Sequence, residues 1–312
     1  MSRIEYKTAD QIRLMRKAGL VVADIHAALR AAAVPGITTA ELDDVARRVL
    51  QDAGARSNFL GYHGYPAHVC ISVNEEVVHG IPGGRALAAG DVVSFDCGAV
   101  VDGWHGDAAF TMILDGHAEA SGDNSDGADR DGGTDQDGGP AQGGTAHAEG
   151  SCRARSADVE LSEVTRDAMW SAIAALADGR RLNVVGEAVE TVVEQHAAAG
   201  HDPLTIIEDY VGHGIGSAMH QEPDVPNYRT ARSGARLRPG MCLAVEPMLT
   251  RGSGQTRVLD DDWTVVTADG ARAAHWEHTV AIHEGGIWVL TAPDGGAAEL
   301  AERGVQVAPL TR

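Results

Sequence analysis

The segment AGDVVSFDCGAVVDGWHGDAAFTMIL, residues 89–114, restricts the fold of this chain more than any other stretch. Two apolar, β-branched runs flank the turn dipeptide Asp102-Gly103, and this pattern predicts a β-hairpin. Each arm carries one acid, Asp96 in the first and Asp107 in the second. Carboxylates inside an apolar sheet cost several kcal/mol each unless a cation neutralises them. The hairpin therefore predicts either a buried cation site or two acids on a solvated face, and the flanking Val, Phe and Met residues favour burial.

Composition limits the classes of partner. The 312 residues suffice for one large domain or two small ones. With 45 acids against 25 bases, the formal net charge is −20, and such a surface repels phosphate backbones, so nucleic acid is not expected as a partner. No apolar run approaches the roughly 18 residues of a membrane span, and the first residues do not resemble a signal peptide. Four widely spaced cysteines suit a reducing compartment, so we expect a soluble, cytoplasmic protein.

Helical periodicity and capping signals predict four main helices. Thr8 is the expected N-cap of the first helix, and Thr38 opens the second with a capping box that ends at Glu41. The expected helices cover residues 8–33, 39–54, 158–177 and 183–199.

Between the hairpin and the third helix the composition changes abruptly. Residues 121–150 consist mainly of Gly, Asp, Ser and Ala and contain no aliphatic side chain larger than Ala. Such a segment cannot bury enough apolar surface to offset its chain entropy. We therefore predict one domain over residues 1–312 with a disordered acidic insert at about 117–156. A calcium-binding acidic loop is the alternative, which the irregular spacing disfavours.

The two halves of the chain repeat one order of features. LAAGDVVSFDCG matches LRPGMCLAVEPM, which aligns Asp96 with Glu246, and VHGIPG matches GHGIGS, which aligns His79 with His213. This order predicts a duplicated helix-helix-strand unit with a pseudo-twofold axis. The expected fold class is α/β (α+β), with a central antiparallel sheet in which the acids of both halves meet.

The side chains that the repeat brings together are four carboxylates and one imidazole. They are Asp96, Asp107, His213, Glu246 and Glu277. Because carboxylates can bridge, this set has room for two cations. A structural zinc site would use four Cys or His ligands, and a calcium site would not normally use His. The mixture suits Mn, Fe(II), Co or Zn in a catalytic pair.

Long, ordered and correctly spaced motifs resemble type I methionine aminopeptidases. They are NFLGYHGYPAHVCISVNEEVVHGIP, FDCG, VDGWHGDAA, VGHGIGSAMHQEP, LAVEPM and HWEHTVAI, and the resemblance covers residues 8–291 without the insert. It implies the pita-bread fold and removal of the initiator methionine from nascent proteins and from peptides with a small second residue. The implied chemistry is attack of a metal-bridged hydroxide on the scissile carbonyl.

The resemblance also implies roles for the metal-ligating set. Asp96 would bind one of two divalent ions, Asp107 and Glu277 would bridge both ions, and His213 with Glu246 would complete the other. Glu246 would also act as general base and then as general acid.

For the substrate, the resemblance implies contacts from His79 and His220 to the scissile amide. An apolar pocket for the methionine side chain is implied at Phe59, Tyr62, Tyr65, Cys70, Met219 and Trp263. The histidines expected to be structural or solvent-facing are His63, His68, His105, His275 and His278. The implied partners are the N-terminal methionine of nascent chains and, transiently, the ribosome, with a monomeric chain that binds no membrane.

Three alternatives remain at this point. A prolidase or aminopeptidase P would share the ligand set but usually carries a large N-terminal domain. A non-catalytic binding scaffold of the same fold would be expected to have lost ligands. A dinuclear phosphohydrolase would need an Arg or Lys phosphate clamp near the motifs, and the sequence shows none there.

Overall fold

The predicted hairpin forms the centre of the structure, a computed structural model that describes residues 3–115 and 144–310 and, over 144–154, the backbone alone. Strands β4 (Val92–Val101) and β5 (Trp104–Ile113) pair antiparallel. Asp102 and Gly103 both have positive φ, as a two-residue hairpin turn requires. Nearly all of β4 is buried, because other elements cover both faces of the strand, and this explains its continuous apolar sequence.

The main sheet joins strands from both halves of the sequence. Among the described residues it has nine strands, in the order β1 (Arg56–Ser57), β4, β5, β14 (Glu277–His283), β9 (Cys242–Val245), β7 (Gly212–Gly214) and β8 (Gln221–Val225), with β2 (Val69–Val73) beside β4 and β15 (Gly286–Val289) beside β14. The pseudo-twofold axis that the repeat predicts would pass between β5 and β14, and a rotation about it would place β4 on β9. The acid-bearing strands that the sequence repeat aligns therefore occupy equivalent places in the sheet.

Two small sheets of three strands complete the β-structure described. One has the order β13 (Ala273–His275), β10 (Met248–Thr250) and β6 (Thr205–Ile206), and the other has the order β11 (Thr256–Val258), β12 (Val265–Thr267) and β3 (Glu76–Val78). A short 3-10 helix, η1, covers Tyr62–Gly64. Because β3 comes from the first half and β12 from the second, their pairing ties the halves together.

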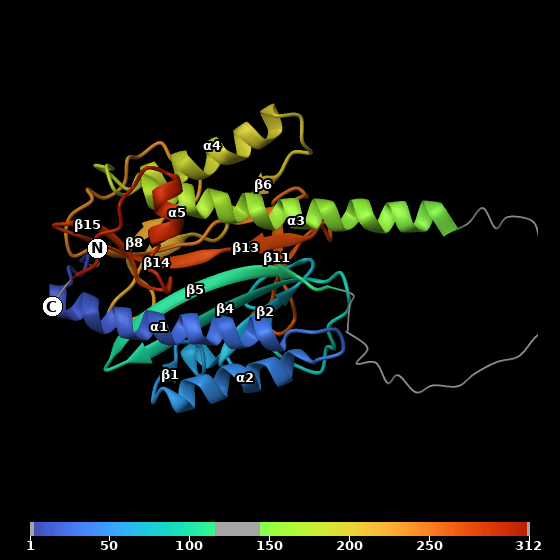
Figure 1. Ribbon diagram of the computed structural model, residues 1–312, viewed down its shortest axis with the longest axis horizontal. Coiled ribbons are helices and arrows are strands. Elements are labelled where there is room, and N and C mark those ends of the chain that lie inside the picture. Colours follow the sequence, from blue (N-terminus) through green and yellow to red (C-terminus); the bar gives the residue numbers. More distant parts are fainter. Residues whose placement is uncertain (1–2, 116–143, 311–312) are drawn as a thin grey trace, which may run out of the picture.

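The helices cover the sheet in pairs (Figure 1). They are α1 (Ala9–Ala32), α2 (Thr39–Asp52), α3 (Gly144–Ala175), α4 (Val184–Ala198) and the short α5 (Ala297–Glu302). The first pair packs on β2, β4 and β5, and the second packs on β9, β14 and β15, so each half of the sheet has its own hydrophobic core. This confirms the predicted class of helix pairs around a central antiparallel sheet. No helix of the described part combines the length and the apolarity that crossing a bilayer would take.

Local signals place the ends of the first two helices as predicted. Thr8 and Thr38 each accept a hydrogen bond from the backbone three residues on, and the side chains of Gln11 and Glu41 bond back to the cap residue. Each capping box satisfies two backbone N–H groups that the helix itself cannot pair.

The predicted C-terminal boundary of the disordered insert was wrong. Helix α3 begins at Gly144, whereas disorder was expected as far as residue 156. Residues 145–156 include Ala, Arg and Glu, which favour helix, and extending an established helix gains one backbone hydrogen bond for each residue ordered. Residues 116–143, which make up the rest of the insert, lie outside the described part of the chain.

Candidate active site

The acids of the hairpin lie on one face of the sheet. Asp96 pairs with Ala109 and Asp107 pairs with Gly98, so the two acids are diagonal neighbours across the hairpin. Glu277 pairs with Ala109 from the other side. The side chains of Asp96 and Glu277 therefore flank the small Ala109, with Asp107 two residues away along β5.

Gly98 makes room beside Asp107. A Cβ at Gly98 would lie 2.2 Å from Nδ2 of Asn58, whose side-chain amide donates to the carbonyl of Gly106 at 3.1 Å. The glycine is thus required by the close approach of Asn58, which holds the backbone next to Asp107.

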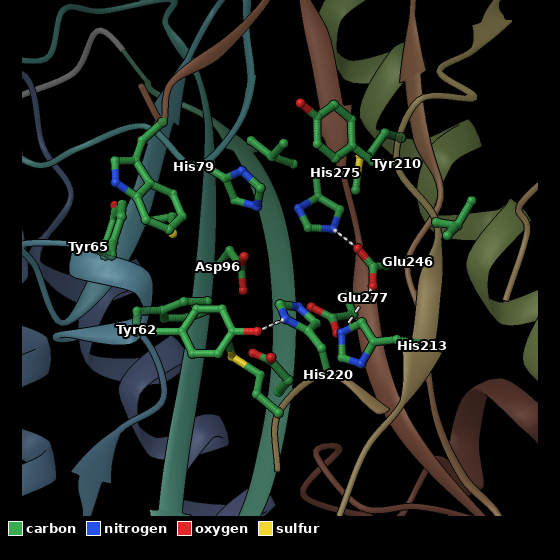
Figure 2. A pocket seen from close by; sticks show the side chains of 18 residues that line it. Tyr62, Tyr65, His79, Asp96, Tyr210, His213, His220, Glu246, His275 and Glu277 are labelled. Atoms are coloured by element: carbon green, nitrogen blue, oxygen red, sulfur yellow. Dashed lines mark hydrogen bonds and ion pairs between the residues drawn. The ribbon is translucent and has the colours of Figure 1, made fainter. Parts of the chain in front are cut away.

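The second half of the chain adds an imidazole and a fourth carboxylate. His213, on β7, donates from Nδ1 to the carbonyl of Gly214 at 3.0 Å. This leaves His213 Nε2 3.4 Å from Oε1 of Glu246, which follows β9. Ligand atoms of Asp107, His213 and Glu277 lie within 4.8 Å of one another. Figure 2 shows Asp96, His213, Glu246 and Glu277 around one space.

These carboxylates are buried and incompletely paired. Asp96, Asp107, Glu246 and Glu277 are each at most 9% exposed, and one oxygen of each has no hydrogen-bond partner in the described part of the chain. Burial raises the pKa of Asp96 to about 7. Burial first, and then repulsion by neighbouring acids, raises the pKa of the other three well above the usual range.

This donor set fits divalent metal. Positive charge would remove the repulsion among the acids and coordinate the unpartnered oxygens. Burial, followed by the neighbouring His220, lowers the pKa of His213 to about 3, so its imidazole is neutral and offers a lone pair. Oxygen ligands with one imidazole suit the borderline transition ions. All five predicted ligands thus lie in one place, and their roles as ligands stay a prediction.

The same side chains line a cavity of about 200 Å³. All six residues predicted for the substrate pocket line it too: Phe59, Tyr62, Tyr65, Cys70, Met219 and Trp263. They pack together as one apolar cluster. Since an apolar cavity of about 150 Å³ holds benzene, this one has the size for a single unbranched side chain.

A ring contact and a hydrogen bond connect the residues of the apolar wall. The rings of Tyr65 and Trp263 meet edge to face at 5.1 Å. The Tyr65 hydroxyl donates to the carbonyl of Gly80 at 2.9 Å, so its polar atom is satisfied and its ring faces the cavity.

His79 and His220 lie between the apolar wall and the acids (Figure 2). His79 has a φ of 62°, a left-handed conformation that costs a non-glycine residue about 1 kcal/mol or more and is often found at functional sites. Burial, followed by the nearby His220, lowers the pKa of His79 to about 4. His220 shares a hydrogen bond of 2.7 Å with the Tyr62 hydroxyl, and its ring lies 4.3 Å from that of His213.

The structure adds His275 to the site, although the sequence analysis had left it among the structural histidines. Its Nε2 is buried, has no hydrogen-bond partner in the described part, and lies 3.9 Å from Oε2 of Glu246. The sequence did carry a signal, because His275 precedes Glu277 by two residues and alternate residues of extended chain share a face. Tyr210, which also lines the cavity, has no such signal.

The other four histidines of that group do not line the cavity. His63 is exposed. Each of the other three forms a side-chain hydrogen bond: His68 with Asp43, His105 with Asn58, and His278 with Thr291. These placements agree with structural or solvent-facing roles.

Comparison with known proteins relates this site to a family. The sequence model of Metallopeptidase family M24 matches residues 13–125 and 148–284. The chain is 44% identical over 289 residues to Methionine aminopeptidase 1 of Mycobacterium tuberculosis, which covers 92% of this chain and 95% of that protein. It is 38% identical to Methionine aminopeptidase 1 of Bacillus subtilis, over 91% of this chain and 98% of that protein.

Solved structures agree with the sequence relatives. The crystal structure of the methionine aminopeptidase from Thermotoga maritima superimposes with a TM-score of 0.75 at 37% identity, covering 93% of this chain and 99% of that one. A prolidase from Pyrococcus furiosus gives a TM-score of 0.61 at 16% identity, and this chain covers 65% of it. The prolidase therefore shares the fold alone.

Proposed function

The chain belongs to metallopeptidase family M24 and, within it, to the methionine aminopeptidases, and on this premise we propose that it hydrolyses the peptide bond after an N-terminal methionine. One observation supports this most directly. A cavity sized for one apolar side chain opens onto four buried carboxylates and an imidazole. A cavity of this size leaves room for a single residue ahead of the scissile bond, which is the geometry of an exopeptidase.

Divalent metal is the cofactor of this family of metallopeptidases, and we assign two ions to the site. Asp96 would bind one ion, Asp107 and Glu277 would contact both, and His213 and Glu246 would complete the second. Bound ions of this kind activate water as a nucleophile and polarise a carbonyl. The unpartnered oxygens of the acids support the assignment, and the ligand types suit Co, Mn, Fe(II) or Zn.

The remaining groups position the substrate and move protons. The methionine side chain would enter the cluster of Tyr65, Cys70 and Trp263, where aromatic rings and sulfur favour a thioether. His79 and His220, kept neutral because burial lowers the pKa of each, would hydrogen-bond the scissile amide. Glu246 would accept a proton from the attacking water and pass it to the leaving amine.

The proposed substrate also suggests the setting. Initiator methionines become accessible on nascent polypeptides with a small second residue, so we expect a transient encounter with the ribosome and a cytoplasmic, monomeric enzyme. The cysteines Cys70, Cys97 and Cys242 are buried and unpaired, as in proteins of reducing compartments.

The test is peptide hydrolysis by the purified chain, freed of metal and then supplied with Mn, Co, Fe(II) or Zn in turn. We expect release of free methionine from Met-Gly-Met with at least one of these ions and none with chelator present. Cleavage of an X-Pro dipeptide instead of Met-Gly-Met would identify a prolidase-like enzyme. A chain that binds no divalent ion would be a scaffold, and either result would overturn the proposal.

A further inference from the structure

A second group of metal-ligating side chains lies outside the cavity, between α3, α4 and the loop that follows α4. Glu160 on α3, His196 in the last turn of α4 and His201 in the loop each offer one ligand atom, and these atoms all lie within 4.8 Å of one another. None of the three lines the cavity of the proposed active site. They also fall outside the motifs that carry the family resemblance.

The two histidines converge on one carboxylate oxygen. Glu160 Oε1 lies 2.5 Å from His201 Nδ1 and 3.5 Å from His196 Nε2. The imidazole rings stack with centroids 4.6 Å apart and planes 15° from parallel. Gly200, with a φ of 91°, turns the chain after α4 so that His201 folds back over His196.

One ligand atom in this group is buried without a hydrogen bond. The His196 side chain is 9% exposed, and its Nε2 has no hydrogen-bond partner in the described part of the chain. A buried polar nitrogen usually has a partner, because burial removes its hydrogen bonds to water without replacing them. The nitrogen faces the hollow that Glu160 and His201 share, so an ion in that hollow would satisfy it.

We propose that Glu160, His196 and His201 bind a borderline divalent cation, with Zn²⁺ the ion that fits best. Two imidazole nitrogens and one carboxylate oxygen form a three-ligand zinc set with a fourth position open. Glu163, one turn further along α3, lines the same hollow, and water can fill the open position. Calcium and magnesium prefer oxygen ligands, so this site discriminates against them.

Two movements are needed to receive the ion. Bonds of about 2.1 Å in a tetrahedron put ligand atoms about 3.4 Å apart, so the Glu160–His201 pair must open by about 1 Å. Because imidazole lone pairs lie in the ring plane, the His201 ring must also turn out of its stack on His196. The His201 side chain is 53% exposed and is free to make these movements. The ion would then join α3, the last turn of α4 and the following loop.

Zinc counting on the full chain tests the site. Native protein and the His201→Ala, Glu160→Gln and His283→Ala variants are dialysed to equilibrium against the same free Zn²⁺, and bound zinc is measured by atomic emission. The first two variants should hold one zinc fewer per chain than the native protein. His283→Ala, which changes a histidine on β14 outside the group, should match the native count. Equal zinc in native, His201→Ala and Glu160→Gln chains would overturn the proposal.

A spectroscopic readout separates this site from the active site. With Cu²⁺ as the probe, the group should give an electron paramagnetic resonance signal with coupling to two imidazole nitrogens, whereas the proposed active-site set has one imidazole. The signal should disappear in His201→Ala, while release of methionine from Met-Gly-Met stays unchanged. Melting of the metal-free variants in chelator checks that they fold, and a persistent two-nitrogen signal in them would contradict the assignment.

Discussion

Glu246 combines two tasks at the residue scale, because the proposed function makes it both a metal ligand and the group that moves the proton. The Glu246→Gln substitution keeps the shape and one oxygen but removes the proton acceptor. We expect kcat to fall by about 10²–10⁴-fold while affinity for a methionine peptide stays largely intact. Steady-state kinetics with Met-Gly-Met, combined with calorimetric binding of the peptide, measure the two quantities separately.

The control for Glu246 is Glu208→Gln, which makes the same chemical change at an exposed residue outside the cavity. Its kcat should equal that of the native chain. A Glu246→Gln protein that turns over at the native rate would remove Glu246 from the proton path.

His275 illustrates how a group can act on the reaction through a neighbour. Its Nε2 faces the Glu246 carboxylate at 3.9 Å, so we expect it to orient this carboxylate rather than to contact the substrate. His275→Leu should lower kcat by about 10-fold or more with little change in KM, a typical cost of removing a group that orients a ligand. His275→Gln, which still offers an N–H, should recover part of the loss.

The comparison of the two His275 variants distinguishes positioning from packing. If His275 served packing alone, both variants would lose melting temperature and neither would lower kcat in the remaining folded protein. Equal kcat in the Leu and Gln variants would contradict the orienting role.

At the scale of elements, Asp158 attaches helix α3 to the sheet region. It is 1% exposed and forms ion pairs with Arg251, at 2.6 Å, and with Arg272. Asp158→Ala would leave two partly buried arginines without their shared partner. We expect a loss of about 3 kcal/mol in the free energy of unfolding, measured by urea denaturation of the metal-free chain.

The matched control is Asp44→Ala, which removes the acid of a solvent-exposed Asp–Arg pair on helix α2. Exposed pairs contribute little, so this variant should unfold at the native urea concentration. A similar result for Asp158→Ala would mean that α3 is held by its apolar contacts alone.

At the scale of the whole molecule, the acidic segment should be dispensable. Residues 121–143 contain no aliphatic side chain larger than Ala, so they have little to add to a hydrophobic core. Deleting them should leave both the melting temperature and kcat/KM for Met-Gly-Met within experimental error.

A second deletion shows that the assay can detect damage. Removing Ala297–Glu302, helix α5, takes away Leu300, which is fully buried in the core beneath α3 and α4. That deletion should lower the melting temperature clearly. A comparable loss after deleting residues 121–143 would mean that the acidic segment supports the fold.

Much of the molecule is encoded in local patterns. The two apolar, β-branched runs, the Asp102-Gly103 turn and the Thr38 capping box depend on neighbours within a few residues, and the structure confirms all three. The internal repeat adds information about residues that are distant in the sequence, because two copies of one unit predict equivalent sheet positions for Asp96 and Glu246. This is why the sequence alone identified the acids that surround the cavity.

The tertiary structure decided what depends on segments that are distant in the chain. Three features depend on how helices and strands pack. They are the position of His275 beside Glu246, the diagonal arrangement of Asp96 and Asp107, and the group of Glu160, His196 and His201. Periodicity tells which face of an element a side chain occupies, but the distance between two faces is set by long-range packing. The sequence by itself therefore predicted the four acids and the imidazole that line the cavity, and the packing of the two halves of the chain brought them together.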